Sequence, residues 1–394
     1  MSAVVTAELL DRVRDRLASA ADTPVPATVA AAIRAEAGGV IGDTDMLAAL
    51  RVLQTELTGA GPLESLLSEP GVTDVLVTAP DQVWIDRGRG LERTGIRFED
   101  EAAVRRLAQR LALSAGRRLD DAQPWVDGRL PGVGQGAFGV RLHAVLAPVA
   151  SGGTCVSLRV LRPATQGLSA LRASGAVTDG AYELLRRIVF GRLAFLVVGG
   201  TGAGKTTLLA ALLGEVDPTE RIVCVEDAAE LAPAHPHVVR LVARAPNVEG
   251  VGEVSVRQLV RQALRMRPDR LVVGEVRGAE VIDLMTALNT GHDGGAGTVH
   301  ANSPAEVPAR LEALAALGGM GRDALHSQLA AAVQVVLHVH RSSDGTRRLR
   351  EIGVVDVDPG GRVHIAAAWS VDAQATPGAH RLRELLNRRC GDNR

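Results

Sequence analysis

Residues 199–207, near the middle of the chain, have the types and spacing that bind phosphate. Four glycines are interleaved with small residues, and Lys205 with two threonines ends the run. Glycines let the backbone curl so that its N–H groups point at phosphate oxygens, and the positive end of a following helix favours the anion. The lysine can reach the outer phosphates while a threonine hydroxyl holds Mg²⁺. The nucleotide-binding residues expected are Gly200, Thr201, Gly202, Ala203, Gly204, Lys205, Thr206 and Thr207, with Thr206 as a Mg²⁺ ligand.

The flanking residues and one compositional fact support this interpretation. The apolar run Leu193–Val198 precedes the loop and Leu208–Leu213 follows it, which is the order of strand, turn and helix that such a loop requires. Of the 44 lysines and arginines, Lys205 is the one lysine. A compact ammonium fits this kind of loop where a flat guanidinium does not. A glycine-rich turn that merely reverses the chain would not explain where that lysine lies.

Acidic residues follow two other predicted strands. Glu226 and Asp227 come after the run Ile222–Val225. Glu275 comes after the run Leu271–Val273. Because the carboxyl ends of parallel strands meet at the edge where the phosphate loop lies, these carboxylates can orient water or hold a metal there. The plainer alternative is that they cap the helices that follow.

Two histidines lie in a stretch dense with glycine and small polar residues. His292 and His300 are separated by a glycine-rich segment that predicts a loop. No cysteine or third close ligand completes a zinc set, so a metal site is disfavoured. The functional interpretation is a hydrogen-bonding sensor of the terminal phosphate, and the alternative is a pair of ordinary loop histidines.

Local patterns divide the chain into three parts. Residues 1–57 predict a helical module with Leu9, Leu10, Val13 and Leu17 on one face. Residues 58–163 alternate short strands and turns around one helix, which indicates a small α+β domain. Residues 164–394 alternate strands with helices and predict an α/β fold, a RecA-like P-loop core with a mostly parallel sheet. Three antiparallel strands and a last helix are expected at its end, with the strands at Val333–His340, Leu349–Val357 and Val363–Trp369.

Composition limits the functional classes. A formal net charge of -1 and an aromatic content of 2% argue against direct binding of nucleic acid. The three cysteines, Cys155, Cys224 and Cys390, lack metal spacing and predict reduced thiols in a cytosolic protein. No uncharged apolar stretch reaches the roughly 18 residues of a membrane span, so membrane contact would require a partner.

Four separated motifs together resemble those of the secretion ATPase superfamily of type II and type IV secretion and type IV pilus systems. They are the acidic stretch Glu226–Leu231, the arginine segment Arg240–Asn247, the run Leu264–Gly278 and the histidine stretch His292–Ser303. The resemblance covers roughly residues 58 to 345. The branch that looks most similar is the tight-adherence group, the motors of Flp-type pilus assembly.

The resemblance implies roles for individual residues. Glu226 matches the glutamate that polarises the attacking water, and Glu275 matches a Walker B glutamate that works with Mg²⁺. His292 and His300 fall on the family's His box. Several arginines would approach the bound ATP, namely Arg240 and Arg244 as arginine fingers and Arg118, Arg129 and Arg159 from the small domain. From the residues alone, each of the three arginines of the small domain is read as a solvated surface arginine or as one that faces the nucleotide across a cleft.

The resemblance also implies an assembly and a location. It implies a homo-hexamer that binds ATP and Mg²⁺, in which closure of the small domain on ATP moves an inner-membrane platform protein. Such a motor is cytoplasmic and is held at the inner face of the cytoplasmic membrane through its partners. The expected function is to power assembly of a type IV or Flp-type pilus, or secretion through a type II/IV-like system.

Three other functions compete with this one. A nucleic-acid motor of related core fold, such as a DNA transfer or packaging ATPase, would show DNA-stimulated turnover, which the near-neutral charge disfavours. A GTPase is disfavoured because an Asn-Lys-x-Asp motif needs a second lysine. A nucleotide-binding scaffold with little turnover is also compatible with these residues.

Overall fold

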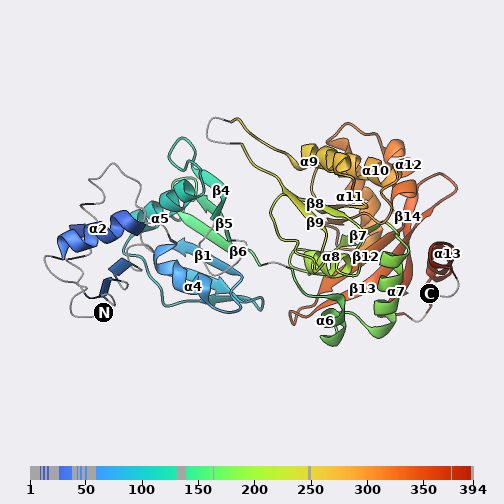
Figure 1. The fold of residues 1–394 in the computed structure, drawn as a ribbon, viewed down its shortest axis with the longest axis horizontal. Coiled ribbons are helices and arrows are strands. Elements are labelled where there is room, and N and C mark those ends of the chain that lie inside the picture. Colours follow the sequence, from blue (N-terminus) through green and yellow to red (C-terminus); the bar gives the residue numbers. More distant parts are fainter. Residues whose placement is uncertain are drawn as a thin grey trace. The chain divides into compact units, whose positions relative to one another are not determined.

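The structure is a computed structural model that describes residues 59–130, 139–162, 164–246, 250–373 and 375–391, the segment 26–37 and a few single residues before position 51. Contacts within the chain divide it into two compact units, residues 1–162 and 163–394 (Figure 1). Leu9 and Val13 of the predicted N-terminal face are buried in a small cluster with helix α2 (Pro26–Glu36), whereas Leu10 and Leu17 lie outside the described residues.

The first unit is built on an antiparallel sheet. Its six strands lie in the order β3 (Leu91–Arg93), β2 (Gln82–Asp86), β1 (Asp74–Ala79), β6 (Cys155–Val160), β5 (Val140–Val145) and β4 (Trp125–Leu130). The short helices η1 (Gly61–Leu63) and α4 (Glu64–Ser68) precede it, and α5 (Glu101–Ser114) packs on the same core. Helix α5 begins where the carboxylate of Asp100 accepts the N–H of Ala103 at 2.7 Å, a side-chain cap. It buries Leu107 and Leu111 on one face.

The second unit contains a mixed sheet of eight strands. Their spatial order is β14 (Val363–Ser370), β13 (Arg347–Val357), β12 (Val335–Arg341), β7 (Phe195–Val198), β11 (Ala296–Val299), β10 (Arg270–Val276), β8 (Ile222–Glu226) and β9 (Val238–Val242). The six strands from β12 to β9 run parallel, and β13 and β14 are antiparallel. The predicted α/β fold with a mostly parallel sheet is confirmed.

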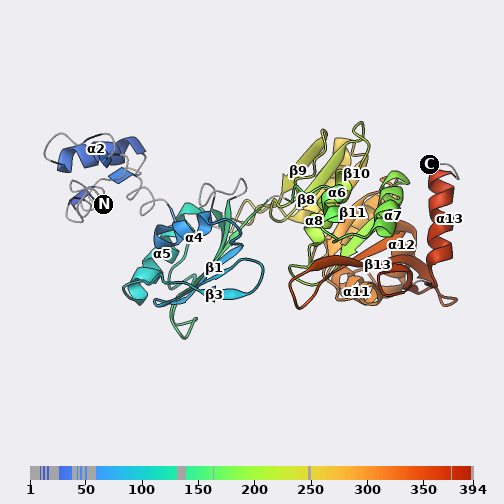
Figure 2. The same cartoon turned by 90° about the horizontal axis from the view of Figure 1, so that it is seen from below.

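Helices cover both faces of this sheet (Figures 1 and 2). One face packs against α6 (Leu168–Ala173), α7 (Asp179–Phe190), α8 (Lys205–Leu213) and α13 (Ala379–Cys390). The other packs against α9 (Val256–Ala263), α10 (Glu280–Asn289), α11 (Val307–Ala316) and α12 (Arg322–Ala332). Adjacent residues of β7 show this alternation, because Leu196 belongs to one core and Val197 to the other, both with 0% exposure. Each such side chain stabilises the fold by about 1.5–3 kcal/mol.

Two predictions about this sheet need correction. The stretch between His292 and His300 is not all loop, because Ala296–Val299 forms the central strand β11. Its glycine content reflects close packing: a Cβ at Gly295 would lie 2.5 Å from Leu288 Cδ2 of α10. Strand β12 was expected to be antiparallel, but it is antiparallel only to β13 and runs parallel to β7 on its other side.

No helix among the described residues is long and apolar enough to cross a membrane.

Candidate functional site

The phosphate loop leaves the carboxyl end of β7 and leads directly into α8. Gly204 has φ 98° and caps α8, which begins at Lys205. A Cβ at Gly199, where φ is 155°, would lie 2.2 Å from the carbonyl oxygen of Val339 in β12. Glycine is therefore required at position 199 by the neighbouring strand and at 204 by the backbone turn. The resulting loop presents its backbone at a helix N-terminus, as an anion site requires.

Lys205 is held inside this loop with only 8% of its surface exposed. Its Nζ donates to the carbonyl oxygens of Gly199 and Gly200, each at 3.0 Å, and lies 3.4 Å from Nδ1 of His300. Burial lowers the pKa of Lys205, and the nearby charge of Glu275 opposes that shift. A buried ammonium that contacts only neutral groups has charge left for an anion.

Glu275 lies next to this lysine in a chain of charged groups. Its carboxylate makes an ion pair with Arg277 and contacts Nε2 of the His300 ring, and Arg277 Nη1 also lies 3.1 Å from Asp227 Oδ2. Burial raises the pKa of Glu275, but Arg277, His300 and Lys205 together hold it below its usual value. Burial and Lys205 lower the pKa of His300. Residues from β7, β8, β10 and β11 therefore meet at one edge of the sheet.

Glu226 turns inward at the end of β8 and is 2% exposed. Its Oε1 accepts the N–H groups of Glu230 and Leu231 at 2.9 and 2.8 Å, so it shapes the loop after β8. Its Oε2 is buried without a hydrogen-bond partner among the described residues. Burial raises the pKa of Glu226 to about 7, and the two backbone N–H groups act against this shift. A Cβ at Gly274 would lie 2.7 Å from Glu226 Cγ, so the carboxylate packs directly on β10.

The two predicted histidines lie at opposite ends of one strand. His300 follows β11 at its carboxyl end, whereas His292 precedes β11 at its amino end, with Nδ1 3.1 Å from the carbonyl oxygen of Ala287. The structure brings His300 to Lys205 and does not bring His292 there. The glycine-rich segment between them hid the strand that separates them.

Arg240 and Arg244 are exposed along the outer strand of the sheet. Arg240 lies on β9, the last strand of the sheet among the described residues, and its Nη1 lies 3.4 Å from the carbonyl oxygen of Leu231. Arg244 donates from Nε to the carbonyl oxygen of Gly252 at 2.9 Å. Burial raises the pKa of Glu226, and the positive charge of Arg240 acts in the opposite direction and lowers it. Both side chains are thus on an edge that another chain can reach.

The predicted arginines of the first unit lie on and beside its sheet. Arg129, Arg141 and Arg159 are directly opposite one another on the neighbouring strands β4, β5 and β6. Arg159 Nε donates to Asp74 Oδ1 at 2.8 Å. Arg118 makes an ion pair with Asp120. The register lines up three guanidinium-bearing residues in one row, which sequence spacing alone did not show.

The oxygen donors for Mg²⁺ belong to the same edge. Thr206 is the second residue of α8, and the carboxylate of Glu275 lies near enough to Lys205 to affect its pKa. A hydroxyl and a carboxylate are the hard oxygen ligands that Mg²⁺ prefers, with phosphates and waters completing its shell. The residues present therefore fit this ion.

A cavity of about 260 Å³ adjoins the loop. It is lined by Gly199, Gly200, His300, Ala301, Asn302, Glu306 and Arg310. The cavity thus connects the start of the phosphate loop with the residues after β11. Arg277 belongs to one of the four motifs, but the motif by itself predicts no role for it. It makes an ion pair with Glu275, whose carboxylate also contacts His300.

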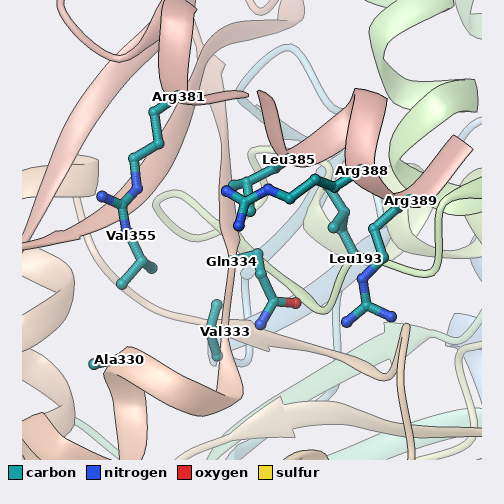
Figure 3. A pocket seen from close by; sticks show the side chains of 9 residues that line it. All are labelled: Leu193, Ala330, Val333, Gln334, Val355, Arg381, Leu385, Arg388 and Arg389. Carbon is teal, nitrogen blue, oxygen red and sulfur yellow. The ribbon is translucent and has the colours of Figure 1, made fainter. Parts of the chain in front are cut away.

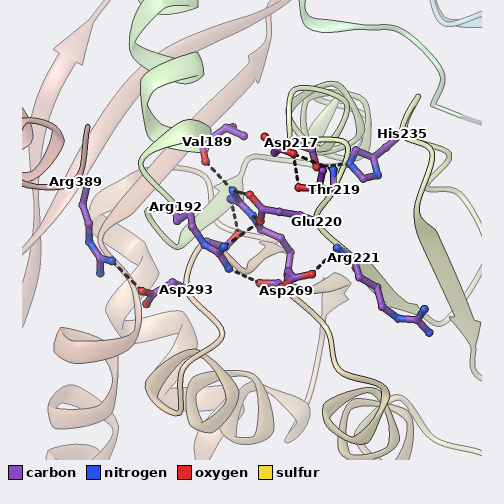
Figure 4. A network of polar contacts seen from close by, with 12 residues as sticks. Val189, Arg192, Asp217, Thr219, Glu220, Arg221, His235, Asp269, Asp293 and Arg389 are labelled. Carbon is purple, nitrogen blue, oxygen red and sulfur yellow. Dashed lines mark hydrogen bonds and ion pairs between the residues drawn. The ribbon is translucent and has the colours of Figure 1, made fainter. Parts of the chain in front are cut away.

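A second group of charges lies at the opposite, amino edge of the sheet (Figure 4). Arg270 is 1% exposed and donates to both carboxylate oxygens of Glu220, at 2.7 and 3.1 Å, and to two backbone carbonyls. Arg192 lies 3.5 Å from the same carboxylate and donates to the carbonyl oxygen of Asp269 at 2.9 Å. These groups satisfy one another's charges and hydrogen bonds, and they hold the starts of β7, β8, β10 and β11 together.

A cavity of about 290 Å³ also lies at this amino edge, under α13 (Figure 3). Apolar side chains such as Leu193, Val333 and Val355 line it together with three arginines of α13. Two of those arginines are already paired, Arg381 with Asp356 and Arg389 with Asp293. This cavity lies where the strands begin, whereas the phosphate loop lies where they end, so the cavity does not belong to the candidate site.

Residues 56–387 match the model of the type II/IV secretion system protein family. The chain belongs to this family. It is therefore a P-loop ATPase of the secretion type.

Individual relatives narrow the context. A Mycobacterium tuberculosis protein that carries the provisional name of conjugal transfer protein is 71% identical over 350 residues, covering 89% of this chain and 99% of the relative. The conjugal transfer protein TrbB of Rhizobium radiobacter is 30% identical over 290 residues, 73% of this chain and 84% of TrbB. The crystal structure of the VirB11 ATPase of the Brucella suis type IV secretion system is 27% identical, covers 78% of this chain and 98% of its own, and has a TM-score of 0.39. The tight-adherence branch stays a prediction.

Proposed function

We propose that this protein is the ATP-driven motor subunit of a type IV secretion or conjugal transfer system. The single observation that carries the proposal is the convergence of Lys205, His300 and Glu275 from three different strands beside the phosphate loop. The names of the relatives, which refer to conjugal transfer and type IV secretion, supply the process.

The chemistry of hydrolysis follows from the charged groups at this edge. The loop amides and the N-terminus of α8 bind the phosphates, and Lys205 exchanges its two carbonyl contacts for phosphate oxygens. Thr206 and Glu275 would hold Mg²⁺, which when bound would supply positive charge to the phosphates. His300, which contacts both Lys205 and Glu275, is placed to sense whether the terminal phosphate is present.

Glu226 is the proposed general base. Its pKa of about 7 and its unpartnered Oε2 suit a carboxyl group that takes a proton from water near neutral pH. The backbone N–H groups of Glu230 and Leu231 donate to its other oxygen, Oε1, and hold it fixed, which leaves Oε2 for this task. His292, which lies at the far end of β11, has no part in this proposal.

The arginines supply the proposed coupling between subunits and domains. Arg240 on the outer strand β9 and Arg244 just after it act as arginine fingers within a homo-hexamer, each at the nucleotide of its own subunit or of the neighbouring one. Arg118, Arg129 and Arg159 of the first unit contact the phosphates when that unit closes. The register supports this role, because it lines up Arg129, Arg141 and Arg159 in one row of the sheet, where Asp127 and Asp74 already pair with Arg141 and Arg159.

The proposed partner is an inner-membrane platform protein, contacted from the cytoplasmic side. Assembly of a Flp-type pilus is a narrower form of the same function and would use the same ATPase with a different platform. Identifying the platform by crosslinking in cells that carry either system would choose between them.

Turnover measurements test the enzyme itself. We expect Lys205→Ala and Glu275→Gln to lose at least about 100-fold in ATP hydrolysis, since each removes charge next to the transferred phosphate. Glu215→Gln is the matched control, because Glu215 lies just beyond the far end of α8 and pairs with Arg186. Unchanged turnover in Lys205→Ala would refute the motor. Native mass with and without a non-hydrolysable ATP analogue tests the hexamer.

Direct action on nucleic acid is the second candidate, and the conjugal transfer names of the relatives favour it. The net charge of -1 opposes it. Turnover measured with and without duplex and single-stranded DNA at two salt concentrations separates the two. DNA-stimulated, salt-sensitive turnover would support the nucleic-acid motor, and no response would support the motor that acts through protein partners.

A further inference from the structure

The hairpin between β12 and β13 lies directly on the phosphate loop. Arg347, the first residue of β13, donates from Nε to the carbonyl oxygen of Gly202 at 2.8 Å. Its Cδ would lie 3.5 Å from a Cβ built on Gly204, and Arg341 Nη1 would lie 3.5 Å from one built on Gly202. Arg347 therefore contacts the centre of the loop, and Arg341 lies beside it, although both are far from the loop along the chain.

The hairpin itself is well defined. Ser342 N donates to the carbonyl oxygen of Thr346 at 2.9 Å, and Asp344 Oδ1 accepts the N–H of Thr346 at 2.8 Å. Gly345 has φ 83°, the left-handed conformation that a tight turn requires. The two arginines thus reach the loop from a fixed turn rather than from a long connection.

The register of the hairpin places basic residues opposite each other. Arg341 and Arg347 are directly opposite each other, and His340 is opposite Arg348. Like charges at opposing positions destabilise an antiparallel pair. The acid of the turn, Asp344, is engaged with the backbone of Thr346. The register thus brings two guanidinium groups to the Gly202 side of the phosphate loop.

We infer that Arg347, supported by Arg341, positions the phosphate loop and adds positive charge to the bound nucleotide within the same subunit. By holding the carbonyl of Gly202, Arg347 fixes the peptide plane between Gly202 and Ala203, whose N–H donates to the carbonyl oxygen of Gly200 at 3.3 Å. This inference rests on ATP binding by the loop and adds a positioning residue to the site around Lys205.

Nucleotide binding by the full chain tests this assignment. Affinity for ADP and for a non-hydrolysable ATP analogue is measured by calorimetry in wild type, Arg347→Gln and Arg348→Gln. Arg348 is the matched control because it lies one residue further on, and its side chain points to the other face of the hairpin. We expect Arg347→Gln to lose about 10-fold or more in affinity, as expected for a lost charge-assisted contact, and Arg348→Gln to stay within about twofold.

Two further readouts separate positioning from a merely structural role. The thermal midpoint of nucleotide-free Arg347→Gln should match wild type, while its rise on adding the analogue should shrink. In turnover assays KM should rise by about the factor lost in affinity while kcat changes little. Equal affinities in Arg347→Gln and Arg348→Gln would overturn the inference, as would a lowered midpoint without nucleotide together with normal affinity.

Lys205→Ala distinguishes this inference from the function on which it rests. If Lys205→Ala loses nucleotide binding and Arg347→Gln keeps it, only the role of Arg347 fails. If neither wild type nor Lys205→Ala binds nucleotide, the nucleotide site and this inference fail together.

Discussion

At the amino edge of the second sheet, Arg270 is 1% exposed and donates hydrogen bonds to both carboxylate oxygens of Glu220. At the carboxyl edge, Lys205 is 8% exposed and contacts two backbone carbonyls and a histidine ring. The same parallel strands join the two edges. The amino edge has an acid for its buried cation, whereas the buried cation at the carboxyl edge contacts neutral groups.

The comparison shows that buried charge by itself does not mark a functional site. The pair Arg270 and Glu220 is as buried as the nucleotide site, but its hydrogen bonds are complete within the chain. At the carboxyl edge, within the described part of the chain, Glu226 keeps an unpartnered oxygen and Lys205 has no hydrogen-bonded acid. Incomplete pairing, which costs stability, is what leaves room for a ligand.

The largest expected effect is the loss of the amino-edge pair. Glu220→Gln leaves the guanidinium of Arg270 buried without its counter-charge, which should lower the free energy of unfolding by about 3–5 kcal/mol. Urea unfolding of the full chain measures it. Glu275→Gln at the other edge should cost less than half as much, because its partner Arg277 is 52% exposed and can turn to water. Equal losses in the two variants would break the comparison.

A smaller effect is the dependence of stability on pH through Glu226. The folded protein holds this proton up to a pKa of about 7, against an ordinary value of 4.5, so this group makes the protein less stable as the pH rises between those values. The loss is at most about 3 kcal/mol. Glu226→Gln carries no such charge, so its advantage over wild type should be absent near pH 4.5 and full at pH 8. Urea unfolding at fixed salt from pH 4.5 to 8 measures the difference, and parallel curves would contradict it.

The smallest effect should come from an exposed pair of the amino edge. Arg389 and Asp293 are 2.8 Å apart, but their side chains are 42% and 48% exposed. Asp293→Asn should therefore change the free energy of unfolding by less than about 1 kcal/mol, since exposed ion pairs contribute little. Measuring it beside Glu220→Gln tests whether burial, rather than the mere presence of a pair, sets the stability of this edge. A loss as large as that of Glu220→Gln would refute this view.

The parts of the site that local sequence predicts are those whose chemistry is local. The phosphate loop, the strand before it and α8 lie where the glycine spacing and flanking apolar runs place them. Glu226 and Glu275 follow from the rule that ligands gather at the carboxyl ends of parallel strands. The convergence of Lys205, Glu275 and His300 could thus be expected before any coordinates.

What the sequence did not reveal depends on contacts between distant segments. Glycines packed against α10 made β11 look like a loop, so His292 and His300 were placed together although a strand separates them. The hairpin that carries Arg347 to the loop is visible only once β12 is seen to lie beside β7. Spacing along the chain carries no information on either of these neighbours.

The burial of Lys205 has a consequence for chemical labelling. As the chain has one lysine, an amine-reactive reagent can acylate a single side chain, and that side chain lies in the phosphate loop where we propose that the nucleotide binds. Bound ATP should shield it, so the rate of acylation reports occupancy without any introduced probe. For the same reason, crosslinkers that react with lysine side chains cannot join neighbouring copies through their outer surfaces. Acetylation in the cell would have one lysine to modify, and that lysine lies in the phosphate loop.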